Sequence, residues 1–407
     1  MFILRDILLP LQDHFSETTL GRERASLFVY TILSIIVPFT SSMTSNLCRC
    51  LDTLFGFEIK NKRFYTFMAS PTLPWAGLWQ TIWGLIPSPE TDGRILVGLD
   101  DSIITKVGKK IFGCEAIFDH AAKSNQSKYP WAQNIVSVGL LKQVKGRWAC
   151  LFLDFRFYLP LKTIQGKKET ATIRGEVVPF QTKMAQAAQA AQMLIEIAEH
   201  FSTVPILAVT DGWFGNNGLW KPAYKAIGNR FNILSRLRCN NVLYDLPEKR
   251  KPKQRGRNKK YGQRLGSATD MAKTVQQEAR FYNVNLYGKQ REVSAYSRVV
   301  MLKTLKRPVQ VVWVFRRTQW IALFTTDLNL SITQIIEYYG ARWKIESGFK
   351  ELKQDIGSQK SQCRNAQAVT NHLNFCMMAT TLTWIYADRL KTNPERQHKV
   401  KQWHSLK

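Results

Sequence analysis

Apolar residues in the first 90 positions recur at intervals typical of helices. They form two clusters, Leu27, Ile32, Ile35 and Ile36, followed by Leu51, Leu54 and Phe55. This spacing predicts short helices joined by loops. Basic residues are interspersed among them at Arg22, Arg24, Arg49, Lys60, Lys62 and Arg63. The segment therefore suits a helical module that contacts DNA, and a purely structural helical cap is the alternative interpretation.

After Pro87-Ser88-Pro89 the pattern changes to short apolar runs separated by turns. Their predicted order is strand, strand, strand, helix, strand, helix, strand. In the chain these are Arg94–Ser102, Asn134–Val144, Trp148–Tyr158, Gln181–Phe201, Pro205–Asp211, the residues after Gly212 through Lys225, and Asn232–Cys239. Lys145-Gly146 is expected to form the turn of a hairpin between the second and third strands. The alternation predicts an α/β layer with a mixed sheet flanked by helices.

Residues 240 to 330 interrupt this alternation. A loop from Lys249 to Lys260 has Lys or Arg at eight of its twelve positions, which indicates a solvated segment with a generic attraction for phosphates. Three predicted strands follow it, at Arg291–Leu305, Val309–Arg316 and Trp320–Thr326. A helix is expected from about Thr333, and a long apolar helix from Ala368 to Tyr386.

These patterns divide the chain into five parts. Residues 1–90 are expected to form a helical domain that suits DNA binding, and 91–239 the first part of the α/β core. Residues 240–330 form a β-rich insertion that carries the basic loop. Residues 331–390 return to the core with two helices, and 391–407 form a basic tail.

The charge of the chain points to a polyanionic partner. Lys and Arg together number 58 against 30 Asp and Glu, a formal net charge of +28 over 407 residues. Because 45% of the residues are apolar and 12% aromatic, the basic residues accompany a real hydrophobic core. The composition therefore favours a nucleic acid over an anionic membrane as the partner of this basic chain.

Cysteine usage and hydropathy indicate a reduced, cytoplasmic protein. The seven cysteines include no Cys-x-x-Cys pair, and the six histidines are scattered, so neither a zinc site nor a disulfide framework is expected. The longest apolar run, Leu27 to Val37, is shorter than the roughly 20 residues needed to span a bilayer. No membrane association and no small-molecule cofactor are expected.

One predicted helix, Ile336 to Lys353, carries an unusual charged stripe. Tyr339, Arg342, Glu346 and Lys353 lie at offsets 0, 3, 7 and 14, with Lys350 between the last two. At about 100° per residue these positions share one face. A second face is apolar and suits packing: Tyr338, Ile345, Phe349, Leu352 and Ile356. A carboxylate among cations suits a metal-bound phosphodiester, where Glu holds the ion and the cations hold phosphates.

Two further acidic positions end predicted strands. Asp100 and the adjacent Asp101 end the first strand, and Asp211 ends the fourth. Two Asp and one Glu are enough to bind two Mg²⁺ ions, which together activate a nucleophilic oxygen and stabilise a leaving oxygen. Each residue also has a structural interpretation, because strand-ending Asp residues often cap turns and Glu346 could pair with Arg342 on a helix surface.

The spacing Tyr339-(2)-Arg342-(3)-Glu346-(6)-Lys353 resembles the signature of one branch of the DDE-class transposases of bacterial insertion sequences. Further agreement lies around the two aspartates and before the final helices, in the segments Leu99-Asp-Asp-Ser-Ile-Ile-Thr-Lys-Val-Gly108, Val209-Thr-Asp-Gly-Trp-Phe-Gly215 and Ala322-Leu-Phe-Thr-Thr-Asp-Leu328. The similarity spans residues 94 to 356 or so.

The resemblance implies an α/β, ribonuclease H-like core with a β-rich insertion and an N-terminal helical domain. It also implies that Asp100, Asp211 and Glu346 bind two Mg²⁺ or Mn²⁺ ions. An Asp-x-Ser pattern favours Asp100 as the first acid, and alignment on a preceding acidic residue favours Asp101; Asp100 is preferred. Contacts with DNA are implied for Tyr339, Arg342, Lys350 and Lys353.

The implied reaction is cleavage at terminal inverted repeats followed by strand transfer, carried out by a homodimer on double-stranded transposon ends and target DNA. Such a protein would associate with the nucleoid when bound. Trp320 lies in a context where some relatives stack a flipped base, although a core role is equally compatible. The alternatives are a repair or junction nuclease with the same core, which does not join ends, and an inactive DNA-binding derivative.

Overall fold

The computed structural model describes residues 3–37, 41–119, 122–158, 172–173, 176–177, 183–248, 257–316 and 319–390. Most of the predicted basic loop and the whole C-terminal tail lie outside these residues. Within them, no helix combines the length and apolar character needed to cross a membrane.

The N-terminal part is helical, as predicted. Its elements are η1 (Ile3–Leu8), η2 (Leu9–His14), α1 (Thr19–Ile36), α2 (Thr44–Phe55), α3 (Asn61–Met68) and α4 (Trp75–Leu85). The side chain of Thr18 accepts a hydrogen bond from the Gly21 N–H and so caps α1. Gly56, at φ 62°, ends α2 in the left-handed conformation that a glycine adopts without steric cost.

Five strands form the centre of the sheet in the order β4–β3–β1–β7–β8. Their bounds are β1 (Ile95–Thr105), β3 (Trp131–Val144), β4 (Arg147–Tyr158), β7 (Ile206–Thr210) and β8 (Phe231–Leu237). β3 is antiparallel to both β1 and β4, whereas β1, β7 and β8 run parallel. The expected mixed sheet is therefore present, and each strand predicted from the sequence forms.

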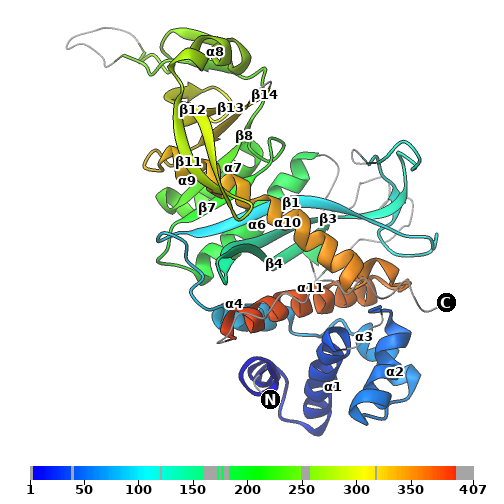
Figure 1. Ribbon diagram of the computed structural model, residues 1–407. Helices are drawn as coiled ribbons and strands as arrows, with labels where there is room; N and C mark the ends of the chain where they lie inside the picture. Colours follow the sequence, from blue (N-terminus) through cyan, green and yellow to red (C-terminus); the bar gives the residue numbers. More distant parts are fainter. Residues whose placement is uncertain are drawn as a thin grey trace, which may run out of the picture.

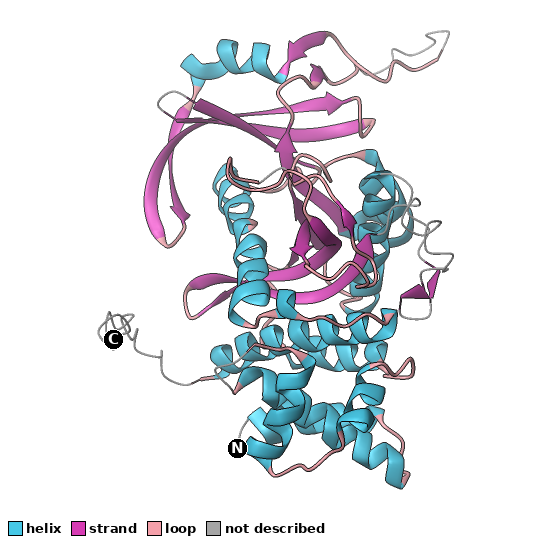
Figure 2. Ribbon diagram, turned by 90° about the vertical axis from the view of Figure 1, so that its right-hand side faces the viewer, coloured by secondary structure: helices cyan, strands magenta, loops and turns pink. Residues whose placement is uncertain are grey.

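The hairpin turn between β3 and β4 is where the sequence placed it. Lys145 and Gly146 have φ angles of 50° and 73°, the pair of left-handed residues that a tight two-residue hairpin requires. β3 is buried along almost its entire length, because helices cover both faces of the sheet here. Figure 2 shows these helices on its two sides, α10 (Trp343–Lys350) on one and α6 (Lys183–His200) on the other.

Residues 240–330 extend the same sheet through the pairing of β8 with β14 (Gln319–Thr325). Its other elements are β9 (Val242–Tyr244), β10 (Arg264–Ser267), α8 (Ala268–Val275), η4 (Gln276–Glu278), β11 (Arg280–Leu286), β12 (Lys289–Leu302) and β13 (Arg307–Arg316). The three strands expected here are confirmed. The short strands β9 to β11 and helix α8 were not predicted. Figure 1 shows this part at the opposite end of the molecule from α1–α3.

The expected single helix before the C-terminus is broken. α9 (Ile332–Ala341) ends before Arg342, α10 begins at Trp343, and a π-helical segment, η5 (Glu351–Asp355), follows. The prediction of one uninterrupted helix was wrong. The break leaves no trace in the apolar spacing, because Ile336, Ile345 and Leu352 on both sides of it are all buried.

The last helix, α11 (Ala366–Arg389), is confirmed and extends beyond its expected ends. It lies beside α4 between the sheet and the helices α1–α3 (Figure 1). The remaining described elements are short: β2 (Glu115–Ala116), β5 (Thr172–Ile173), β6 (Glu176–Val177), α7 (Asn217–Ile227), η3 (Gly228–Arg230) and η6 (Ser358–Lys360).

Candidate active site

Two predicted acids lie side by side where parallel pairing ends. β1 and β7 pair up to Leu99 and Thr210, so Asp100 and Asp211 occupy the next positions along the chain. The prediction that Asp100 and Asp101 end the first strand was wrong, because β1 continues to Thr105 through its pairing with β3. Asp211 directly follows β7, as predicted. Oδ1 of Asp211 accepts hydrogen bonds from the backbone N–H groups of Trp213 (2.9 Å) and Phe214 (3.0 Å). Asp211 therefore does cap the following turn, and this role engages one of its carboxylate oxygens.

Arg342 connects the first strand to the acidic residue of α10. Its Nη1 lies 2.8 Å from Oδ2 of Asp100, and its Nη2 lies 2.8 Å from Oε1 of Glu346. The Arg342 side chain is 12% exposed, that of Asp100 16% and that of Glu346 35%. Glu346 is thus a partner of Arg342, as its structural interpretation expects. Arg342 also pairs with Asp100 of β1, so the ion pair is not confined to the helix surface.

The two adjacent aspartates point to opposite faces of the sheet, as successive strand residues do. Asp100 faces α10 together with Ser102, whose Oγ accepts a hydrogen bond from Lys353 Nζ at 2.7 Å. Asp101 instead accepts a hydrogen bond from Asn134 of β3, at 3.2 Å. The structure therefore brings Asp100, rather than Asp101, to Arg342 and Glu346.

Burial raises the pKa of Asp100 to about 7. The charge of Arg342 acts against this rise, while the nearby charges of Asp211 and Asp101 add to it. Burial also lowers the pKa of Lys353 and raises that of Tyr339. A dense group of carboxylates with little access to water favours the binding of a cation.

The remaining predicted residues divide into two groups. Tyr339 lies near the acids, with the Arg342 guanidinium 5.8 Å from the centre of its ring, and Lys350 is exposed at the end of α10. Trp320 lies farther along the sheet, on β14 opposite Phe315 of β13. It is half-buried and packs against the hydrophobic core.

Two arginines at the end of β8, one in the strand and one directly after it, belong to this region and were not singled out from the sequence. Arg236 and Arg238 are exposed. Nε of Arg238 donates to the Gly212 carbonyl at 3.2 Å, and its guanidinium lies 5.5 Å from the centre of the Trp213 ring. The charge of Arg236 acts on Tyr339. The alternation Arg-x-Arg at the end of an apolar strand was the available signal.

The oxygen donors suit a hard divalent cation, because Mg²⁺ prefers a few carboxylates completed by water and phosphate oxygens. Asp211 fits such a role as it stands. Asp100 and Glu346 do not yet, because the Arg342 guanidinium contacts the carboxylates of both. Accordingly, no three His, Cys, Asp or Glu side chains within the described ranges are grouped to hold one ion.

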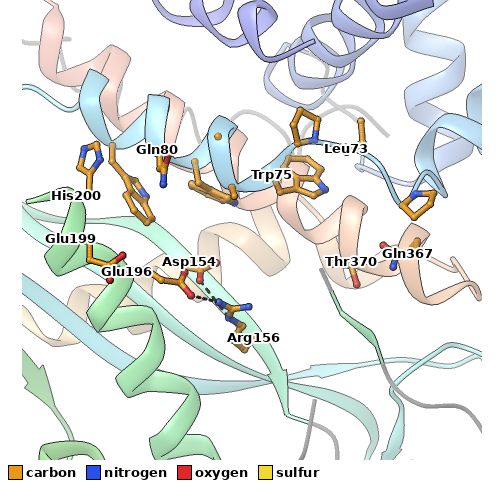
Figure 3. A pocket seen from close by; sticks show the side chains of 16 residues that line it. Leu73, Trp75, Gln80, Asp154, Arg156, Glu196, Glu199, His200, Gln367 and Thr370 are labelled. Atoms are coloured by element: carbon orange, nitrogen blue, oxygen red, sulfur yellow. Dashed lines mark hydrogen bonds and ion pairs between the residues drawn. The ribbon is translucent and has the colours of Figure 1, made fainter. Parts of the chain in front are cut away.

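A large cavity of about 870 Å³ lies elsewhere, lined by α4, β4, α6 and α11 (Figure 3). Arg156 of β4 extends into it and pairs with Asp154 at 3.6 Å and with Glu196 of α6 at 2.8 Å. The indole of Trp75 forms part of its wall. These charges connect β4 to α6, and the cavity contains none of the three predicted acids.

The fold and site together define a mixed α/β protein with clustered carboxylates beside basic side chains. The family described as DDE superfamily endonuclease matches residues 36–298, more than half of the chain. The protein belongs to this family, and it is therefore an enzyme of the nuclease or transposase type whose substrate is DNA. The match includes Asp100 and Asp211 and ends before Glu346. No curated protein matches the chain.

Proposed function

We propose that the protein is the transposase of an insertion sequence. It binds the terminal inverted repeats of the element, cleaves a strand at each end and transfers the freed 3′ ends to target DNA. The Tyr339, Arg342, Glu346 and Lys353 signature supports this branch of the family. The strand order β4–β3–β1–β7–β8 supports a ribonuclease H-like core.

Asp100, Asp211 and Glu346 are the residues that would hold two Mg²⁺ or Mn²⁺ ions. Such ions, when bound, activate the attacking oxygen and stabilise the leaving oxygen of a phosphodiester. Through such ions these carboxylates would orient the reacting phosphate beside Asp100, in the middle of β1, and Asp211, directly after β7; no covalent protein intermediate is required. Asp211 is held in place for this role by the two backbone N–H groups that it caps.

The cations around the acids would bind the backbone of the DNA end. Lys350 and Lys353 lie along α10 and η5, and Arg238 lies beside the Asp211 turn, directly after β8. Phosphate contacts of this kind fix the register of a duplex on a protein without reading its sequence. These cations would therefore hold the backbone that flanks the scissile phosphate.

The observation that carries the proposal is the meeting of three distant segments at one point. Asp100 and Asp211 follow the last pair of the β1–β7 ladder. Asp100 and Glu346 are 246 positions apart in the sequence, and the Arg342 guanidinium contacts the carboxylates of both at 2.8 Å. Basic side chains reach the same region, with Lys353 donating to Ser102 at 2.7 Å and Arg238 to the Gly212 carbonyl at 3.2 Å.

The test uses a duplex that carries the end of the element. Asp211→Ala or Glu346→Gln is expected to abolish Mg²⁺-dependent cleavage, while binding measured by gel shift persists. Retained cutting in either variant would contradict the proposed roles. Melting curves recorded beside wild type establish that each variant is folded.

The family description of endonuclease also favours a second candidate, a repair or junction nuclease that does not join ends. Incubation of a pre-cleaved end with a supercoiled plasmid distinguishes the two functions. Joined products indicate a transposase, whereas cutting without joining, selected by DNA structure, indicates the nuclease. Absence of both activities in the wild-type protein would leave a DNA-binding derivative.

A further inference from the structure

Arg342 is buried and paired with carboxylates, unlike an exposed arginine that is free to bind DNA. Its guanidinium is 12% exposed and contacts two carboxylates, one from β1 and one from α10. Its third nitrogen, Nε, is buried and has no hydrogen-bond partner among the described residues. The guanidinium is thus held by charge between Asp100 and Glu346, but it is not fully satisfied there.

The backbone at Arg342 departs from regular α-helical hydrogen bonding. α9 ends at Ala341 and α10 starts at Trp343, so Arg342 stands at the junction of two helices. Its backbone N–H bonds to the Tyr339 carbonyl at 3.2 Å, the shorter turn of a 3₁₀ type.

Two cations cannot occupy the same place between these carboxylates. An ion shared by Asp100 and Glu346 would lie where the guanidinium now lies, and the two positive charges would repel each other. Removal of the guanidinium requires another anion for it, because an unpaired buried charge is strongly unfavourable. The phosphates of a DNA backbone are such anions, and guanidinium pairs with them well.

We propose that Arg342 is a displaceable internal cation that holds Asp100 and Glu346 together before metal enters and leaves them for a DNA phosphate. This inference rests on the proposed function. It makes Arg342 a positioning residue with two alternative partners. It also couples the two ligands: DNA that draws Arg342 away should strengthen metal binding, and by linkage metal should strengthen DNA binding by the same factor.

The experiment is a calorimetric titration of the full-length protein with Mn²⁺. Arg342→Gln removes the charge and is expected to bind Mn²⁺ about tenfold more tightly than wild type in the absence of DNA, a coupling of ordinary size. A duplex taken from the DNA flanking the coding region should tighten Mn²⁺ binding by wild type and have little effect on the variant. Equal or weaker binding by Arg342→Gln would overturn the inference.

The matched control is Arg298→Gln. It breaks another arginine–aspartate pair, with Asp245 at 2.6 Å in the insertion, and should leave Mn²⁺ affinity unchanged. If Arg342→Gln does not fold, Arg342→Met provides the same test, because it also removes the charge while keeping an unbranched side chain of similar reach. An affinity of Arg342→Met no higher than that of wild type would overturn the inference as well.

The outcomes also separate this inference from the proposed function. Wild type that binds Mn²⁺ and cleaves DNA, together with an unaltered Mn²⁺ affinity in the Arg342 variants, would refute only the role of Arg342 as an internal cation. Absence of Mn²⁺ binding in all variants, with and without DNA, would refute both.

Discussion

Adjacent residues on a strand can have unrelated roles, and Asp100 and Asp101 illustrate this. Asp100 faces α10 and pairs with Arg342 at 2.8 Å, whereas Asp101 faces the other way and bonds to Asn134. Both are aspartates, and their positions differ by one residue. The pleat of β1 alone separates them.

This separation gives a matched pair of substitutions. Asp100→Asn removes a proposed metal ligand and is expected to reduce the rate of Mg²⁺-dependent cleavage on the order of 10³-fold, which corresponds to about 4 kcal/mol of transition-state stabilisation. Asp101→Asn keeps the volume and should reduce the rate by less than about tenfold. Single-turnover cleavage measures both, and an equal loss in the two variants would contradict the assignment of Asp100.

At the residue scale the sequence singled out Asp100, Asp211 and Glu346, and their roles as metal ligands stay a prediction. The strand-end argument holds for Asp211, which follows β7, but not for Asp100, which lies in the middle of β1. The choice between Asp100 and Asp101 stayed open, because it depends on which face of β1 the helix covers. The pairing of Arg342 with two carboxylates could not be predicted, since Asp100, the partner outside its own helix, is 242 positions away in the sequence.

At the scale of elements, α3 presents a mostly polar outer face. Phe64, Phe67 and Met68 are buried, and the exposed positions are Asn61, Lys62, Arg63, Tyr65 and Thr66. These residue types can contact DNA phosphates and base edges. Arg63 is engaged by Glu23, which leaves Lys62 as the better probe of a DNA contact in the proposed N-terminal DNA-binding domain.

Substitution of Lys62 by Ala tests this helix. If Lys62 contacts a phosphate, the variant should bind end DNA more weakly, and the slope of log K against log salt should fall by about 0.9, the value for one lost contact. Fluorescence anisotropy over a range of salt concentrations measures the slope. Lys303→Ala, at an exposed position after β12, is the control. An unchanged slope in Lys62→Ala would place the DNA elsewhere.

Elements were predictable where their pattern was long or their turn chemistry distinctive. The β3–β4 hairpin is an example, because Lys145-Gly146 satisfies the tight turn between two long runs. β9 has three residues and β10 four, too few for periodicity to register. The break at Arg342 was not predicted, because the apolar spacing of a long helix continues across it. The break coincides with the ion pair that Arg342 forms with Asp100 of β1, a tertiary contact that the sequence pattern does not show.

At the scale of the whole molecule, α11 connects the N-terminal helices to the sheet. Asn371 accepts a hydrogen bond from Trp75 Nε1 at 2.7 Å and donates to the carbonyls of Met68 and Ser70. On the sheet side, Thr381 Oγ1 donates to the carbonyl of Phe152 at 2.8 Å. The hydrophobic core likewise continues from the first helices through the sheet to α11.

This connection predicts that the described helices and sheet unfold together. Asn371→Ala leaves the Trp75 N–H and two carbonyls buried without their partner, so we expect a loss of about 3 kcal/mol in the free energy of unfolding. Because α11 belongs to both parts, the loss should lower the midpoint of a single transition in calorimetry, rather than release the N-terminal helices at a lower temperature. Gln354→Ala, at an exposed position of η5, should leave the midpoint unchanged. Two separated transitions in Asn371→Ala would show instead that residues 1–90 fold as an independent domain, and DNA binding by that fragment alone would then become the appropriate test of its role.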